Sequence, residues 1–274
     1  MATVRAVMQA LESRFPPEYA QEWDEVGLSV GDPDATVERV LFAVDATLAT
    51  AQEAITCGAQ LLVTHHPLML RGVTSVAADT PKGAIAHRLI VAGCALFTAH
   101  TNADAAHYGV NDALARALDL RETTPIVPHL DEPAIGLGRV GSLPLEMSLR
   151  DFASDVAAAV PATAGGVRVA GDPDMRVQKI AILGGAGDSL LDVVAAQDAD
   201  VFVTADLRHH PALESRERAE LSNGRPALVD VSHFASESLW LEDSAEYVAR
   251  ECAVDTVVST VVTDPWTVRL GTDA

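Results

Sequence analysis

The stretch Leu61-Leu62-Val63-Thr64-His65-His66-Pro67-Leu68 joins a short apolar run to two adjacent histidines and a proline. The apolar run predicts a buried strand, and in α/β proteins ligands and catalytic groups gather where such strands end. Neutral imidazoles at that position are natural ligands for transition metals. Pro67 disfavours a helical conformation for His66, so the two imidazoles should lean apart. The stretch therefore predicts an α/β protein with a two-metal site, in which each histidine serves a different ion.

Composition and charge favour a mixed α/β protein and exclude one class of partner. The chain has 274 residues, 49% hydrophobic and 4% aromatic, with a net charge of −20. Its length is enough for one large or two smaller domains. A broad nucleic-acid-binding surface needs many Lys and Arg side chains, which this charge balance argues against. A nucleotide held by bound metal ions remains compatible with it.

The cysteines and the N-terminal segment predict a cytoplasmic protein. Cys57, Cys94 and Cys252 are widely separated and form no C-x-x-C pair, which favours a reduced compartment without disulfides. The first fifteen residues show the pattern of an amphipathic helix rather than a signal peptide. No apolar segment reaches the length needed to cross a membrane.

The order of apolar runs and capping signals predicts two similar α/β halves with mainly parallel or mixed sheets and helices on their faces. Prolines and glycines over 121–138 place the boundary so that the halves are 1–128 and 129–274. Residues 227–274 are expected to pack back on the first half and complete the metal site. The specific expectations are helices over 3–14 with Thr3 as N-cap, 47–57, 81–92, 111–118, 148–160 and 233 to about 250, a glycine-rich turn at 184–188, and a closing strand over 257–262.

Two further polar clusters supply candidate partners for His65 and His66. Asp104 follows the strand expected over 95–98, and His233 and Glu237 lie four residues apart at the start of a helix, where they share one face. Three histidines and two carboxylates suit zinc, iron or manganese better than calcium. Each cluster also has a purely structural interpretation: a solvated helix face, a helix-capping acid or a satisfied turn. Three clusters at three strand ends favour the metal site.

Two other sites are left open by the residues alone. Trp23 beside Asp24 could line a pocket, but anchoring of a loop on the core is the favoured interpretation of Trp23. His209-His210-Pro211 repeats the first His-His-Pro after a second predicted strand, and we expect it near the metal site without ligating the ions.

Together these motifs resemble the Nif-three-like dinuclear-metal proteins, also called GTP cyclohydrolase 1 type 2 homologs. The resemblance runs from about residue 5 to the end and lacks the inserted domain of longer members. Two departures are Ala205, where glycine is common, and Ala103, where larger apolar residues are common. The matching motifs are Trp23-Asp24-x-x-Gly27-Leu28, Thr64-His65-His66-Pro67-Leu68, His100-Thr101-Asn102-x-Asp104, Thr204-x-Asp206-x-x-His209-His210 and His233-x-x-x-Glu237.

The resemblance implies a Nif-three-like fold, a toroidal homohexamer and two divalent ions per subunit. It also implies the same five ligands that the spacing selected: His65, His66, Asp104, His233 and Glu237.

The expected function is hydrolysis of a nucleotide or phosphoester by water that the ions activate. His100, His209 and His210 are the candidate catalytic residues, as proton relays or phosphate contacts. Whether the chain is an enzyme stays open at this stage. The alternative is a non-enzymatic, metal-binding hexameric scaffold or regulatory protein.

Overall fold

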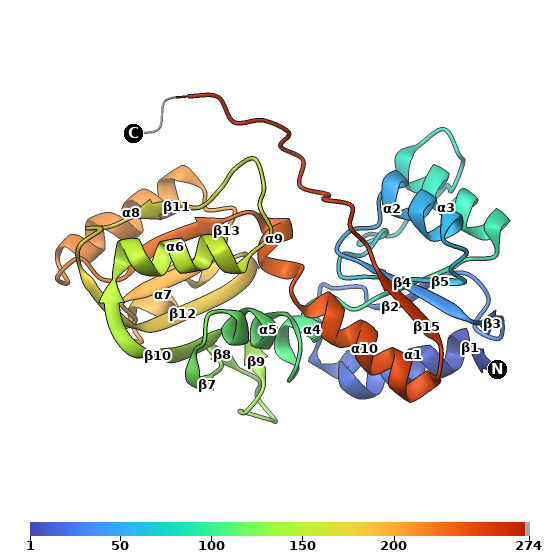
Figure 1. Cartoon of the computed structure of the whole chain (residues 1–274), viewed down its shortest axis with the longest axis horizontal. Helices are drawn as coiled ribbons and strands as arrows, with labels where there is room; N and C mark the ends of the chain where they lie inside the picture. Colours follow the sequence, from blue (N-terminus) through green and yellow to red (C-terminus); the bar gives the residue numbers. More distant parts are fainter. Residues whose placement is uncertain (272–274) are drawn as a thin grey trace. The chain divides into compact units, whose positions relative to one another are not determined.

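Strand β5, which carries the His-His-Pro motif at its end, is the central strand of a five-stranded sheet in the computed structural model, which describes residues 1–271 (Figure 1). This sheet belongs to the first of two compact units, formed by Met1–Gly109 and Trp240–Thr263. Its elements are β1 (Ala2–Thr3), α1 (Val4–Arg14), the 3-10 helix η1 (Pro17–Tyr19), β2 (Gly27–Val30), β3 (Thr36–Val37), β4 (Arg39–Ala43), α2 (Leu48–Thr56), β5 (Leu61–Thr64), α3 (Pro81–Ala92), β6 (Ala95–Thr98), α4 (Thr101–Ala105), α10 (Trp240–Cys252) and β15 (Asp255–Val258).

The sheet of the first unit is mixed and covered on both faces. Its strand order is β15-β4-β5-β6-β2, with all neighbours parallel except the antiparallel edge strand β2. Leu41, Leu62 and Leu96 point to one face and pack with residues of α2 and α3. Helices α1 and α10 pack on each other, and α10 also contacts β4. Figure 1 shows this pair on the side of the sheet opposite α2 and α3. Because β4, β5 and β6 run parallel, the residues that follow them emerge at the same edge.

The second unit comprises Val110–Leu239 and the segment after Thr263. Ser232 Oγ hydrogen-bonds the Asp264 carboxylate within it. Its elements are α5 (Val110–Ala117), β7 (Arg121–Thr124), β8 (Val127–Pro128), β9 (Gly136–Leu137), β10 (Arg139–Ser148), α6 (Leu149–Ala159), β11 (Arg168–Ala170), β12 (Arg176–Ala186), the 3-10 helix η2 (Asp188–Leu190), α7 (Leu191–Ala195), β13 (Val201–Ala205), α8 (His209–Glu220), β14 (Ala227–Val231) and α9 (His233–Glu237).

A six-stranded mixed sheet forms the centre of this unit. Its order is β11-β14-β13-β12-β10-β7, with β12, β13 and β14 parallel and the outer pairings antiparallel. Residues of α5, α6 and α9 pack against one face, and residues of α7 and α8 against the other. The expected fold class of two α/β halves with mixed sheets is confirmed.

The predicted helix ends at Thr3 and Gly93 are confirmed because their signals are local. The Thr3 hydroxyl accepts a hydrogen bond from the Ala6 amide at 3.2 Å, and Gly93 caps α3 with φ of 67°.

Three local predictions were wrong. The glycine-rich turn at 184–188 is not a turn at its start, because β12 continues through Ala186. The single helix from 233 is two helices, α9 and α10, separated at Ser238–Leu239. The closing strand is β15 (Asp255–Val258), so it begins earlier and ends four residues sooner than expected.

The expected boundary at 128/129 lies inside the second unit. Strand β7 pairs with β10 as the edge of the six-stranded sheet, and Leu114 and Leu118 pack in the core of that unit. The pairing therefore assigns α5 and β7 to the second unit, although the prolines that follow them are typical of a linker. From the C-terminal part, Ala227–Leu239 stays in the second unit and Trp240–Thr263 belongs to the first.

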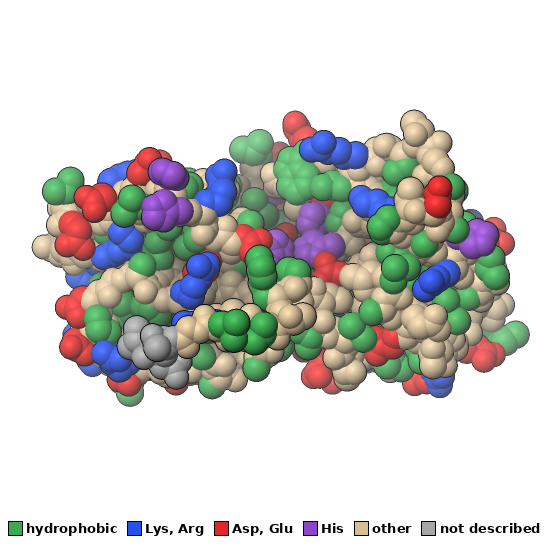
Figure 2. Space-filling view, turned by 90° about the horizontal axis from the view of Figure 1, so that it is seen from above, with side chains coloured by type: hydrophobic (Ala, Val, Ile, Leu, Met, Phe, Trp, Pro, Cys, Tyr) green, Lys and Arg blue, Asp and Glu red, His purple; other side chains and the backbone are tan. Residues whose placement is uncertain are grey.

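Charged side chains of both signs are scattered over the face in view in Figure 2. On the face in view in Figure 2, Lys and Arg side chains are scattered among acidic ones and do not form a broad basic surface. Among residues 1–271, no helix combines the length and hydropathy needed to cross a membrane.

The packing predicts unequal effects for two nearby leucines of the second unit. Leu149 is fully buried in its core, whereas Leu145 is 75% exposed. We expect Leu149→Ala to lower the free energy of unfolding by about 2–5 kcal/mol, because it leaves a cavity. The matched control Leu145→Ala should change it by about 0.5 kcal/mol or less. Urea denaturation measures both, and equal effects would contradict this assignment of the core.

Candidate metal centre

Three histidines of the first unit converge at the ends of β5 and β6. His65 and His66 follow β5, and His100 follows β6, whose Thr98 is in register with Thr64. One ligand atom from each of the three imidazoles lies within 4.8 Å of the others. The parallel pairing of β5 and β6 produces this cluster, because it brings the ends of both strands to one edge. His100 was expected to be catalytic, and the structure places it beside the two predicted ligands.

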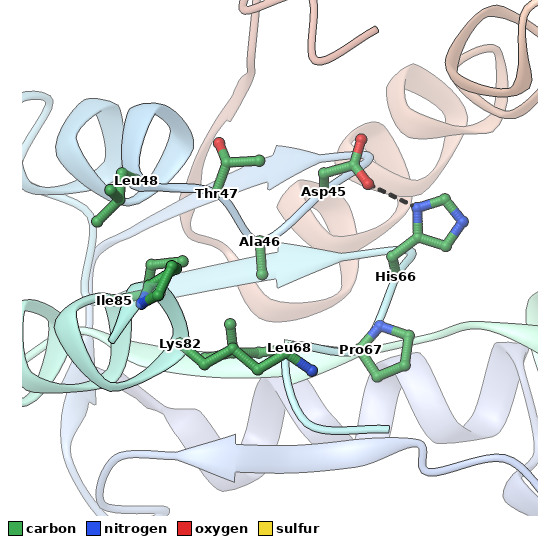
Figure 3. Close-up of a pocket in the computed structure, with 10 residues that line it drawn as sticks. Asp45, Ala46, Thr47, Leu48, His66, Pro67, Leu68, Lys82 and Ile85 are labelled. Carbon is green, nitrogen blue, oxygen red and sulfur yellow. Dashed lines mark hydrogen bonds and ion pairs between the residues drawn. The ribbon is translucent and has the colours of Figure 1, made fainter. Parts of the chain in front are cut away.

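Each of these imidazoles is oriented by a hydrogen bond from Nδ1. Nδ1 of His65 lies 2.9 Å from the carbonyl oxygen of Ala99. A carbonyl can only accept, so Nδ1 carries the proton, and Nε2 of the neutral ring carries the lone pair. Nδ1 of His66 lies 2.8 Å from Asp45 Oδ1 (Figure 3), and Nδ1 of His100 lies 2.7 Å from Asp24 Oδ1. This pattern is typical of metal-binding histidines, whose second nitrogen donates to a carbonyl or a carboxylate.

A buried carboxylate stands beside the His65 ring. Oδ1 of Asp104, from α4, lies 3.6 Å from Nε2 of His65, and the His65 side chain is fully buried. A buried carboxylate is costly unless a cation or hydrogen-bond donors compensate its charge. The donor set of imidazole nitrogens and a carboxylate oxygen therefore fits a divalent transition-metal ion.

The second unit holds a similar pair at the end of β14. His233 and Glu237 lie on α9, with Nε2 of His233 3.1 Å from Oε1 of Glu237. Nδ1 of His233 lies 2.8 Å from Oδ2 of Asp206. Glu237 is only 3% exposed. The four-residue spacing thus brings both side chains to one face of α9, as expected.

Two glycines that the sequence analysis assigned to a turn make room for this pair. A Cβ on Gly185, whose φ is +77°, would overlap Oε1 of Glu237 and lie 3.4 Å from Nε2 of His233. The amide of Gly185 donates to Oγ of Ser236, and that of Gly184 donates to Oδ1 of Asn111, both at 2.9 Å. The adjacent glycines were the sequence signal for this contact. Their role could not be predicted from the sequence alone, because it depends on β12 passing beside α9.

Asp24 is a charged residue whose role the sequence analysis left open. Burial raises the pKa of its carboxyl, but hydrogen bonds from His100 and Thr101, with the nearby charge of His100, lower the pKa to about 2. Asp24 is therefore ionised at neutral pH. Trp23 does not anchor the loop on the core as favoured, because it is 59% exposed. Its ring instead meets the His100 ring edge-on, with centroids 5.9 Å apart.

The second His-His-Pro motif differs from the first. His209 and His210 form the exposed first turn of α8, and their rings contact each other with centroids 5.1 Å apart. Within residues 1–271, neither histidine belongs to a group that could hold a metal ion. His209 lines a separate cavity with Arg168 and Arg216.

The two departures from the family pattern, Ala205 and Ala103, and the cysteines are compatible with the histidine–carboxylate sites. Ala205 is a buried residue of β13 paired with Val231, and Ala103 is buried in α4. Burial raises the pKa of Cys94 to about 12 and also raises that of Cys252. These thiols stay protonated at neutral pH and are poor metal ligands.

Comparison with known proteins identifies the family. Residues 2–265 match the model of the family described as Duf34/NIF3 (NGG1p interacting factor 3). A GTP cyclohydrolase 1 type 2 homolog of Streptomyces coelicolor is 48% identical, with 98% of this chain and 95% of the relative covered. A Mycobacterium tuberculosis protein of the same name is 37% identical, with 95% of both chains covered. The chain belongs to the DUF34/NIF3 family.

Two solved structures share the fold of this chain. A Staphylococcus aureus hypothetical protein, SA1388, superposes with a TM-score of 0.86 at 30% identity and covers 97% of this chain and 99% of its own. A Bacillus cereus protein related to NIF3 gives a TM-score of 0.86 at 25% identity, with 96% and 98% covered. The resemblance drawn from the motifs is confirmed.

The low pKa of Asp24 predicts a pH-dependent contribution to stability. Its folded pKa of about 2 lies below the ordinary 3.8, so the stabilisation is complete above about pH 4 and is lost as the pH falls towards 2. At pH 7, Asp24→Asn should lower the free energy of unfolding by about 2 kcal/mol. Urea denaturation from pH 7 to pH 2.5 should show that difference shrinking below about pH 4. A difference that does not depend on pH, or an equal effect of Glu22→Gln at a nearby exposed carboxylate, would contradict this account.

Proposed function

We propose that this chain is a dinuclear metal-dependent hydrolase that acts on a nucleotide or phosphoester. In this proposal His65, His66, Asp104, His233 and Glu237 hold two divalent ions, drawn from zinc, iron and manganese. The observation that carries it is the pairing of buried carboxylates with oriented imidazoles: Asp104 faces Nε2 of His65, and Glu237 faces Nε2 of His233. Such donor sets suit metals that bind nitrogen and oxygen together.

Bound ions of this kind lower the pKa of water and polarise the bond under attack. The chain's own contribution to proton transfer would come from His100. Its Nδ1 hydrogen-bonds the ionised Asp24 at 2.7 Å, which orients the ring and leaves Nε2 of the neutral imidazole to accept a proton from the attacking water. The same nitrogen would return the proton to the leaving group.

His209 and His210 stay predictions as catalytic residues. Their position in the exposed first turn of α8 provides no support like the Asp24 contact of His100. The homohexamer implied by the resemblance likewise stays a prediction.

We choose a phosphoester or nucleotide as the substrate class because metal-activated water attacks such substrates readily. The relatives' name, GTP cyclohydrolase 1 type 2 homolog, makes GTP one member of the test panel. Opening of a purine ring and cleavage of a phosphoester both begin with attack by activated water. A panel that contains GTP, other nucleotides and simple phosphoesters shows which of the two reactions occurs.

Metal content tests the ligand set directly. Glu237→Ala should lower the metal bound per chain by at least about half, because it removes a proposed ligand that is buried beside His233. Glu217→Ala, at an exposed glutamate of α8, is the matched control and should leave the metal content unchanged. Elemental analysis of purified protein provides the measurement. Equal metal content in both variants and the parent would contradict the assignment of Glu237.

Activity and metal content, measured together, separate a metal ligand from a residue that only transfers protons. With GTP, other nucleotides and simple phosphoesters as substrates, His65→Ala should lose activity together with metal. His100→Ala should lose on the order of 10²-fold or more in kcat, the usual contribution of general acid–base catalysis, while it keeps its metal.

If the metal-loaded parent hydrolyses none of these substrates, the hydrolase proposal fails. Metal-dependent assembly or partner binding would then support the scaffold interpretation. Loss of metal from His100→Ala would instead reassign His100 as a ligand.

A further inference from the structure

A cavity of roughly 360 Å³ opens beside the His66–Asp45 pair in the first unit. It lies between the start of α2, the residues that follow His66 and the start of α3, and it is open to solvent. Figure 3 shows Asp45 and His66 on one side, with Leu48, Leu68 and Ile85 along the walls. The mechanism proposed above uses none of these residues except His66.

The walls are apolar, and one cation reaches them. The side chains of Leu48, Leu68 and Ile85 line the cavity together with prolines. Lys82 also lines it, and in Figure 3 its side chain extends from the start of α3 with the amino end directed towards Pro67. Lys82 is an exposed residue, so its ammonium group is accessible to a ligand while its alkyl stem borders the cavity. Such a site combines apolar walls with one positive charge.

Lys82 is an unusual feature of this chain. The sequence has only two lysines, Lys82 and Lys179. Nζ of Lys179 hydrogen-bonds the carbonyl oxygen of Gln197 at 2.5 Å. Among residues 1–271, Lys82 has neither a hydrogen bond nor an ion pair, so its charge is available to a ligand.

The backbone adds positive potential at the same place. Helices α2 and α3 both begin at the cavity, with Leu48 and Pro81 as their first residues. Neither helix has an acidic residue in its first turn, so no side chain of the first turn offsets the partial positive charge of either N-terminus. The acid in the wall, Asp45, is engaged by Nδ1 of His66 at 2.8 Å and by the Thr263 hydroxyl.

A local positive site matters because the chain as a whole repels anions. At a net charge of −20, an anionic substrate needs a cationic group near its binding site. Lys82 meets this need beside a proposed metal ligand, while the apolar walls offer a contact surface to the uncharged part of the substrate.

We propose that this cavity selects the substrate: it holds the apolar body of a phosphorylated small molecule whose phosphate pairs with Lys82. The inference rests on the proposed function only for the reaction at His66. Binding in the cavity does not require turnover. Lys82 is thus a specificity-determining residue.

Phenylphosphonate is a suitable probe because it joins an apolar ring to a phosphate-like anion through a bond that hydrolysis does not cleave. Titration should shift the methyl resonance of Ile85 in the cavity wall. Lys82→Met keeps the alkyl stem and removes the charge, so it should weaken binding on the order of threefold to tenfold, as for a charge-assisted hydrogen bond at a partly exposed site. Lys82→Arg should restore most of the affinity.

Lys179→Met is the matched control, because it makes the same change in net charge at the other lysine; it should bind like the parent. Benzyl alcohol, a ring without the anion, should bind equally weakly to the parent and to Lys82→Met. Equal affinities of Lys82→Met and Lys179→Met for phenylphosphonate, or no shift of Ile85 in the parent, would overturn the proposal.

The Glu237→Ala variant distinguishes this proposal from the hydrolase proposal. Phenylphosphonate binding that persists there and still depends on Lys82 supports the cavity site, whatever the outcome of the turnover assays. Binding that is lost with the metal would show that the anion goes to the ions, and it would contradict the role given to Lys82.

Discussion

The hydrogen bond from Nδ1 is the constraint on which the whole site depends. His65, His66, His100 and His233 each direct Nδ1 to a carbonyl or carboxylate oxygen between 2.7 and 2.9 Å away. This fixes the ring orientation and leaves Nε2 as the reactive nitrogen. Three of the acceptors follow strands: Asp45 comes after β4, Ala99 after β6 and Asp206 after β13. The parallel sheets therefore position both the imidazoles and the groups that orient them.

Much of the site could be predicted because its residues follow strands that are recognisable as short apolar runs. His65-His66, Asp104 and His233 stand after β5, β6 and β14, and parallel pairing takes such residues to one edge of each sheet. The acceptors were harder to predict. Asp24 is separated from His100 by 76 residues, and nothing in the local pattern at Asp24 indicates which side chain it will meet.

The errors in the fold have the same origin. Gly184-Gly185 is typical of a turn, yet β12 continues through it, because Ala186 pairs with Ala205 of β13. The missing side chain at Gly185 leaves room for Glu237. The apolar pattern after His233 continues past Leu239, but α9 and α10 belong to different units. The prolines after β7 suggested a linker, while pairing with β10 assigned β7 to the second sheet. Local signals predict helix caps well, and long-range contacts decide where elements continue.

X-ray absorption spectroscopy of the zinc-loaded protein tests the central claim most directly, because it reports the atoms that surround the metal. The account predicts a first shell of nitrogen and oxygen at about 2.0–2.2 Å, with the outer-shell scattering of imidazole. A sulfur shell near 2.3 Å, or a shell of oxygen without imidazole scattering, would contradict a centre built from these histidines and carboxylates.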